Sequence, residues 1–134
     1  MSISCQTLYN DVCRIVGLGT GNDNLSSAFT RAVNRSLDKL SVRANLEVPH
    51  AHITQINTTI STLNAKYEYV LASGVMYYIV RLGFQASDPR VATVQYRDSE
   101  SAWEKDTGEY VSDLINIAQS DEDEDIALLG KVST

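Results

Sequence analysis

The side chains best suited to chemistry in this chain are two histidines, His50 and His52, and the nearby carboxylate of Glu47. In an extended segment both imidazoles lie on one side, and three such groups can bind a metal ion. No further ligand motif surrounds them, and the sequence patterns G-x-S-x-G, H-E-x-x-H and the P-loop do not occur. We therefore interpret the pair as incidental and expect no catalytic residue, no metal and no cofactor.

The remaining reactive or glycine-rich features also favour structural roles. Cys5 and Cys13 lie eight positions apart in a predicted helix, so their Cα atoms are about 12 Å apart, too far for a disulfide. The glycine-rich residues 17–21 follow a predicted helix and lack the P-loop lysine, which indicates a helix stop. Five contiguous acids at 121–125 do not follow the spacing of a calcium loop. These patterns predict buried thiols and a protein that is not an enzyme.

Charge is distributed unevenly along the chain. Residues 1–97 contain nine Lys and Arg against six Asp and Glu, whereas residues 98–134 contain two against eleven, for a net charge of −6. Net acidity argues against nucleic-acid binding as the main role, because phosphate contacts need concentrated basic residues. No signal-peptide pattern or membrane-length apolar run occurs. We expect a soluble protein made in a reducing cytoplasm.

Hydrophobic periodicity predicts an all-α fold, a small bundle of about four helices near 4–16, 25–45, 61–83 and 89–119. Asp88 followed by Pro89 predicts the start of the fourth helix. Pro49 interrupts residues 47–62, which are rich in Ile and Thr and predict a projecting loop with a little β structure, such as a short hairpin. Residues 1–119 then form one helical domain, followed by an extended C-terminal arm at 120–134.

The second and third predicted helices carry long apolar stripes. In the second, the stripe is Leu25, Phe29, Val33, Leu37 and Leu40. The third should form the centre of the core, and Gly74 lies within its stripe, where a missing side chain lets another helix approach closely. Tyr69 and Tyr77 fall off this stripe, which makes them candidates for contacts between subunits.

A row of basic residues follows the second helix at four-residue intervals, about 200° around the helix from the apolar stripe. Its members are Arg31, Arg35, Lys39 and Arg43. The row is either the solvated face of an amphipathic helix or a ridge that receives an acidic segment, for instance from a neighbouring subunit.

The fourth predicted helix combines a narrow aromatic seam with acidic faces. Tyr96, Trp103, Tyr110 and Ile117 recur every seven residues, a spacing typical of packing against one neighbour. The acidic residues around this seam are Glu100, Glu104, Asp106, Glu109 and Asp113. After the acidic run at 121–125 come Ile126, Leu128 and Leu129, which indicate either a disordered end or an arm that orders when it docks into a partner groove.

Several of these residues together resemble a known family. They are Tyr67, Leu71, Gly74, Tyr78 and Leu82, then Asp88, Pro89, Ala92, Tyr96 and Trp103, with residues 32–40 of the second helix. Over about half of the chain, the pattern is similar to the head–tail connector adaptors of tailed bacteriophages, small helical proteins that form a ring beneath the portal.

The resemblance implies a structural role in the virion, at the head–tail interface, for a protein made in the host cytoplasm. It implies a homo-oligomeric ring, commonly dodecameric, between the portal protein and a downstream tail or stopper protein. Loop 47–62 and arm 120–134 would bind the portal or adjacent subunits. The acidic residues of the fourth helix would face the channel and let DNA slide without specific binding. The alternative is a small cytoplasmic regulatory or interaction protein that binds a basic partner through its acidic end.

Overall fold

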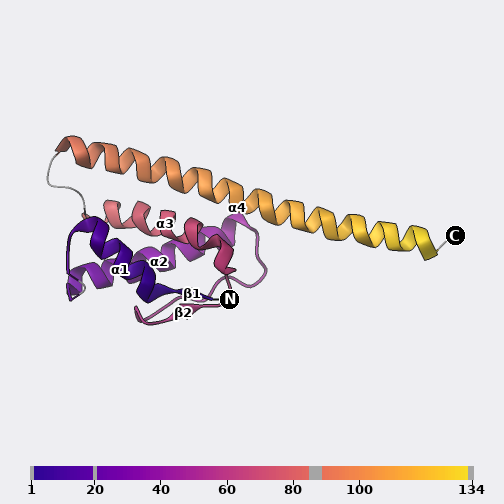
Figure 1. The fold of residues 1–134 in the computed structure, drawn as a ribbon, viewed down its shortest axis with the longest axis horizontal. Helices are drawn as coiled ribbons and strands as arrows, with labels where there is room; N and C mark the ends of the chain where they lie inside the picture. Colours follow the sequence, from indigo (N-terminus) through magenta and orange to yellow (C-terminus); the bar gives the residue numbers. More distant parts are fainter. Residues whose placement is uncertain (1, 20, 85–88, 133–134) are drawn as a thin grey trace.

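The computed structural model describes residues 2–19, 21–84 and 89–132, with side chains described as far as residue 117. The described residues form four α-helices: α1 (Cys5–Val16), α2 (Asp23–Arg43), α3 (Glu68–Arg81) and α4 (Pro89–Val132). A 3-10 turn, η1 (Ala65–Tyr67), leads into α3. The helical bundle expected from the sequence is confirmed (Figure 1).

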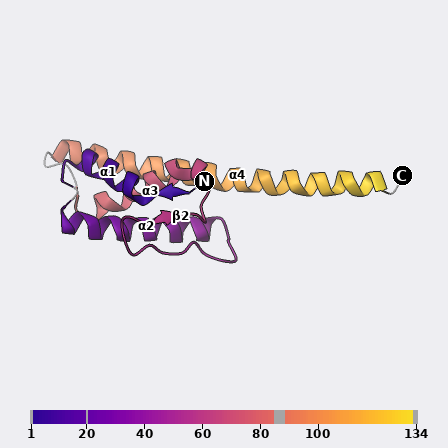
Figure 2. The ribbon, with the colours of Figure 1, turned by 60° about the horizontal axis from the view of Figure 1, so that its bottom comes forward.

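Helix α3 is the centre of the bundle. It packs mainly against α2 and α4, and both ribbon views show it between these two helices (Figures 1 and 2). The α2 stripe that the sequence predicted, from Leu25 to Leu40, is completely buried. Leu71, Val75 and Ile79 of α3 are buried as well. Burial of these stripes provides the main favourable term in folding, because it removes apolar surface from water.

At Gly74, α3 approaches both α2 and α4 closely. A Cβ atom added there would lie 2.5 Å from Ser36 Oγ of α2 and 2.7 Å from Cζ3 of Trp103 of α4. Carbon atoms in van der Waals contact lie about 3.5–4.0 Å apart, so no side chain fits at this position. The close helix approach predicted from Gly74 is confirmed.

Side-chain caps fix where the first two helices begin. The hydroxyl of Ser4 accepts a hydrogen bond from the Thr7 N–H at 3.3 Å, and the side chain of Asn22 accepts one from the Leu25 N–H at 3.0 Å. Helix α1 ends at Gly17, whose φ of 81° requires the conformational freedom of glycine. Local sequence therefore determines these boundaries.

Residues 47–62 lie against α2 instead of standing free. The N–H of Ile53 donates to Asn34 Oδ1 at 2.7 Å, and Asn34 Nδ2 donates back to the Ile53 carbonyl at 3.0 Å. The β structure expected in this segment is present as β2 (Thr59–Ile60). Its antiparallel partner is β1 (Ile3–Ser4) at the start of the chain, with Ile3 opposite Ile60. The segment therefore ties the N-terminus to the bundle.

Helix α2 begins and ends two residues earlier than expected and α3 ends two residues earlier, and two other limits differ by more. The third helix begins at Glu68, because the Asn64 side chain accepts from the Lys66 N–H and forms a 3-10 turn first. The fourth does not end near Gln119 but continues to Val132, so the arm at 120–132 is helical and projects beyond the bundle (Figure 1). No proline occurs after Pro89, and Ala, Glu and Leu favour helix. Pro89 is the first residue of α4, and the expected cap Asp88 lies outside the described residues.

Candidate assembly surfaces

The basic row of α2 lies on the surface, on the side of the helix away from the core. Arg31, Arg35 and Arg43 are exposed and Lys39 is half-buried. None of the four forms an ion pair or hydrogen bond with another residue that the structure describes. The one acid within the row, Asp38, is held instead by His52, whose Nε2 lies 2.7 Å from its Oδ1. The positive charge of the row is therefore not neutralised by a contact within the described chain.

A shallow hollow adjoins the C-terminal half of the basic row. Its volume is about 320 Å³, and its lining comes from Arg35, Asp38, Lys39, Val42 and Tyr78. Val42, which lines this hollow, is 77% exposed. This part of α2 thus presents cations beside an uncovered apolar side chain.

Arg81 organises the contact between α3 and the first half of α4. Its guanidinium carbon lies 3.4 Å from the ring centroid of Tyr77 and 4.2 Å from that of Tyr96. Its Nη1 donates to the Tyr77 carbonyl at 2.9 Å, and its Nη2 lies 3.5 Å from Glu100 Oε2. Tyr77 also lies beside Trp103, with ring centroids 6.2 Å apart. Tyr77, expected at a subunit contact, is half-buried in this cluster of its own chain.

The acidic residues of α4 do not share one surface. Successive residues are about 100° apart around a helix, so Glu100 and Glu104 lie on one flank of the Trp103 seam. The other three lie on the opposite flank: Asp106, Glu109 and Asp113. Glu100 pairs with Arg81, and Asp106 accepts a hydrogen bond from Ser73 Oγ. Four of the five residues expected to face a channel are exposed: Glu100, Glu104, Glu109 and Asp113. Of these, only Glu100 forms an ion pair with another described residue.

Tyr69 of α3 lies near the three acidic residues Asp106, Glu109 and Asp113 of α4. It is 42% exposed, which keeps it available for an intersubunit contact. Desolvation raises the pKa of its phenol, and the carboxylates of Glu109, Asp113 and Asp106 raise it further. The phenol therefore stays protonated near neutral pH and can donate a hydrogen bond.

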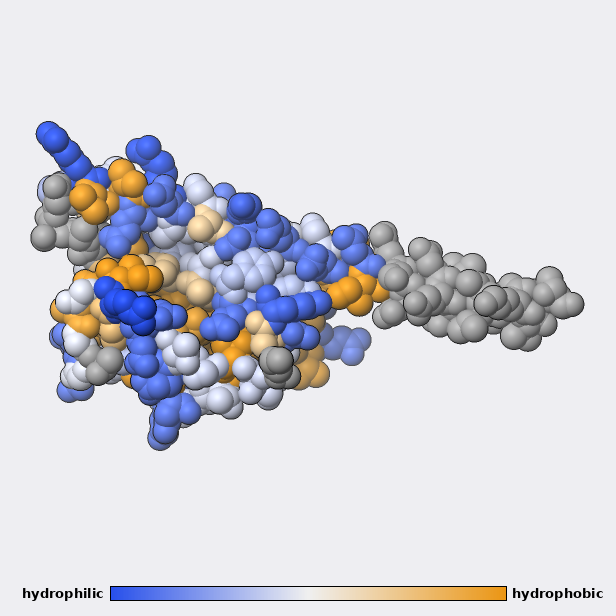
Figure 3. Space-filling model, viewed as in Figure 1, coloured by the Kyte–Doolittle hydropathy of each residue, from blue (hydrophilic) through white to orange (hydrophobic). Residues whose placement is uncertain are grey.

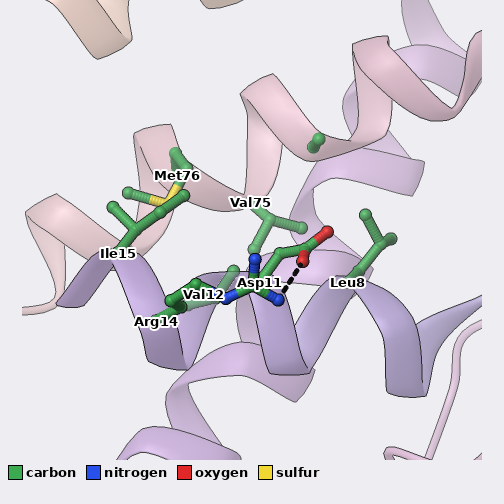
Figure 4. Close-up of a pocket in the computed structure, with 8 residues that line it drawn as sticks. Leu8, Asp11, Val12, Arg14, Ile15, Val75 and Met76 are labelled. Carbon is green, nitrogen blue, oxygen red and sulfur yellow. Dashed lines mark hydrogen bonds and ion pairs between the residues drawn. The ribbon is translucent and has the colours of Figure 1, made fainter. Parts of the chain in front are cut away.

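An apolar groove between α1 and α3 was not expected from the sequence. Figure 4 shows Ile15 and Met76 at one end of it and Leu8 at the other. Its volume is about 300 Å³, and the ion pair between Arg14 and Asp11, at 3.2 Å, lies at its rim. Helical periodicity places Ile15 in the buried stripe of the first helix, but this side chain is 60% exposed. Adjacent residues of α1 such as Val12 and Cys13 are both buried, so helical spacing alone could not single out Ile15 as exposed.

The aromatic seam of α4 is buried only in its middle. Trp103 and Tyr110 are buried, whereas Tyr96 and Ile117 at its two ends are exposed. Apolar atoms therefore appear on the surface over the first turns of α4 and where it leaves the bundle (Figure 3). Beyond that point the backbone is helical to Val132. The side chains of Ile126, Leu128 and Leu129, expected to bind a partner, lie outside the described residues.

The two histidines bind different partners. His50 is buried, and its backbone N–H donates to Ser41 Oγ at 3.0 Å. The Nδ1 atom of its imidazole lies 2.9 Å from Thr62 Oγ1. Burial lowers the pKa of its imidazole. Cys5 and Cys13 are buried free thiols, as expected, and desolvation raises the pKa of Cys5 to about 11. His50 therefore holds the segment 47–62 against α2, and the two cysteines fill the core.

The chain matches none of the protein-family models, curated proteins or solved structures with which it was compared. Within the ranges that the structure describes, no three His, Cys, Asp or Glu side chains gather as a metal ligand set. No helix in the same ranges is long and apolar enough to cross a membrane. The features available to a functional proposal are the basic row, the groove and the projecting part of α4.

Proposed function

We propose that this chain is a structural connector that assembles as a ring beneath the portal of a tailed bacteriophage and joins the head to the tail. The observation that carries this proposal is the length of α4 beyond the bundle (Figure 1). Leu114 is the last residue of α4 known to pack against the core, and the helix continues for about 27 Å from there to Val132. A helix this far outside its own core suits a subunit of a larger assembly.

Two unlike surfaces on one molecule support a ring. A ring needs a heterologous contact, in which one surface of a subunit binds a different surface of the next. Here the α2 face is basic and the second half of α4 is acidic. Copies arranged head to tail would bring these opposite charges together, whereas a symmetric pair through either surface alone would bring like charges together.

Fewer residues are expected to face the channel in this proposal than the sequence suggested. Glu100 and Asp106 are held by Arg81 and Ser73, which leaves Glu104 alone on one flank of α4 and Glu109 and Asp113 as neighbouring exposed carboxylates on the other. Carboxylates that face a DNA channel repel the phosphate backbone and so prevent tight binding. These two residues are the candidates to face the DNA.

The proposal requires a portal protein encoded in the same genome, and the test is association with that protein. Purified portal rings and the chain are mixed and sedimented, and the pellet is examined by electron microscopy. We expect a second ring of density stacked on the portal, and the chain should also be found in purified virions by mass spectrometry. Failure to sediment with the portal, together with absence from virions, would refute the connector function.

The projecting acidic helix also suits a second candidate, an interaction protein that binds a basic partner through its C-terminal end. A chain truncated after Ser120 separates the two. In the connector, truncation weakens association with portal rings or neighbouring copies. In the interaction protein, light scattering shows a monomer with and without the portal, and truncation removes binding only to the basic partner.

A further inference from the structure

We propose that the acidic end of α4, residues 121–129, binds the basic row of α2 on the next copy of this chain. The inference deepens the proposed ring, on which it rests, by naming the contact that would build it. It accounts for two features at once: a row of cations without partners among the described residues, and a helix that leaves its own bundle.

The basic row has the properties of a docking surface for an acidic segment. Arg31, Arg35, Lys39 and Arg43 follow one another at four-residue intervals and form no ion pair with described residues. At the C-terminal end of the row, Val42 is largely uncovered beside the shallow hollow that Tyr78 helps to line. An occupant of matching chemistry carries several carboxylates followed by apolar side chains.

Residues 121–129 have this composition in this order. Five consecutive acids at 121–125 precede Ile126, Leu128 and Leu129. On α2 three of the four basic residues, Arg31, Arg35 and Lys39, also precede Val42 along the chain. A parallel alignment of the two helices therefore places acid near base and apolar near apolar. The row from Arg31 to Lys39 spans about 12 Å and the acidic run about 6 Å, so the run fits within the row.

The arm cannot reach the row of its own chain. Helix α4 is continuous from Pro89 to Val132, and both ribbon views show its last part beyond the end of α2, directed away from the bundle (Figures 1 and 2). Residue 121 lies about 10 Å past Leu114 along this helix, and residue 129 about 22 Å past it. The row must therefore be filled by the arm of a second copy.

A contact of this kind propagates. Each copy that offers its arm keeps its own basic row free, and the next arm fills that row, so successive copies form a closed ring or an open filament. Exposed ion pairs are individually weak and are screened by salt. The assembly should therefore dissociate as the salt concentration rises.

Charge reversal on each side tests the proposal. One variant carries Arg31→Glu, Arg35→Glu, Lys39→Glu and Arg43→Glu, and the other replaces the five acids at 121–125 with Lys. Sedimentation velocity at low salt should show the wild type associating, each variant alone monomeric, and a mixture of the two variants associating again. The matched control, Arg97→Glu with Lys105→Glu, changes exposed basic residues elsewhere and should associate like the wild type. Circular dichroism verifies that each variant is folded.

Cross-linking of the wild type gives a second readout that needs no variant. A carbodiimide joins the Lys39 amine to a nearby carboxylate, and equal amounts of ¹⁵N-labelled and unlabelled chain are mixed beforehand. We expect peptides that join Lys39 to residues 121–125 and combine one labelled with one unlabelled partner. Cross-links confined to a single label, or none between these segments at high protein concentration, would overturn the proposal.

The two proposals fail in different ways. If the mixed variants associate but the chain never sediments with the portal, the contact stands and the connector function falls. If both charge-reversed variants form wild-type rings on the portal, the connector function stands and the contact falls. Loss of association in the arm variant alone places the arm on another surface, such as the groove between α1 and α3, and also overturns the contact.

Discussion

Replacing Gly74 with Ala would test the packing of α2, α3 and α4 against one another. The new Cβ would lie 2.5 Å from Ser36 Oγ, 2.9 Å from Ser36 Cβ and 2.7 Å from the Trp103 ring. Neither neighbour can move freely. Ser36 Oγ is buried and donates to the Ala32 carbonyl at 2.8 Å, and the Trp103 ring packs against Tyr77 and Tyr78.

The expected free-energy change combines opposing terms. Alanine is favoured over glycine in a helix by about 1 kcal/mol. Overpacking a filled core costs about 1–3 kcal/mol, and displacing Ser36 from its hydrogen bond costs about 1 kcal/mol more. We therefore expect Gly74→Ala to lower the free energy of unfolding by about 1–3 kcal/mol, which lowers Tm by roughly 4–12 °C in a chain of this size.

Urea unfolding followed by circular dichroism and by the fluorescence of Trp103, the single tryptophan, measures this change. Gly108→Ala is the matched control, because Gly108 lies in α4 and an added Cβ there would meet nothing within 4 Å. This control should stabilise the chain by up to about 1 kcal/mol. In a Ser36→Ala background, which removes the nearest atom, the Gly74→Ala penalty should shrink by about 1 kcal/mol.

A Gly74→Ala chain as stable as the Gly108→Ala control would contradict this packing. The same holds if Ser36→Ala leaves the penalty unchanged, because the clash with Ser36 Oγ would then play no part. An unaltered emission spectrum of Trp103 would place the ring away from Gly74.

Three further perturbations have defined outcomes. Leu71→Ala, at a fully buried position, should cost about 2–5 kcal/mol in urea unfolding. In a Cys13→Ser chain, Cys5 should react with a thiol reagent only when the structure opens, because its side chain is fully buried. Burial also raises its pKa to about 11, which leaves little reactive thiolate; fast labelling of the native chain would contradict this. Burial lowers the pKa of His50, so below about pH 6.5 the unfolded chain binds a proton more readily than the folded one. The resulting stability is complete above that pH and is lost as pH falls towards the lowered pKa, so His50→Asn should reduce the loss of stability seen in urea unfolding below about pH 6.5.

Local patterns were sufficient to predict the basic row and the buried stripe of α2. Both follow from the helical repeat alone, since residues four apart share a face whatever the helix packs against. The close approach at Gly74 was predictable for a related reason, because a glycine within a long apolar stripe lowers helix propensity and implies a packing role. The groups that Gly74 meets, Ser36 and Trp103, were not predictable.

The length of α4 shows where a local pattern misled. The fourth helix was expected to end near Gln119, just before the acids at 121–125, but it continues to Val132. Helix-forming residues and the absence of a further proline outweigh repulsion between side chains that water and salt screen. This continuity is the feature that places the acidic end outside the bundle.

The sequence by itself determined the helical class, the apolar stripes and the separation of basic from acidic residues, because each depends on spacing along one chain segment. Only the tertiary structure decided which charged and aromatic side chains have interaction partners within the chain. Arg81 lies between Tyr77 and Tyr96 and pairs with Glu100, and β1 pairs with a strand more than fifty residues away. Such contacts depend on how whole helices pack, and that packing leaves the basic row of α2 without a partner in its own described chain.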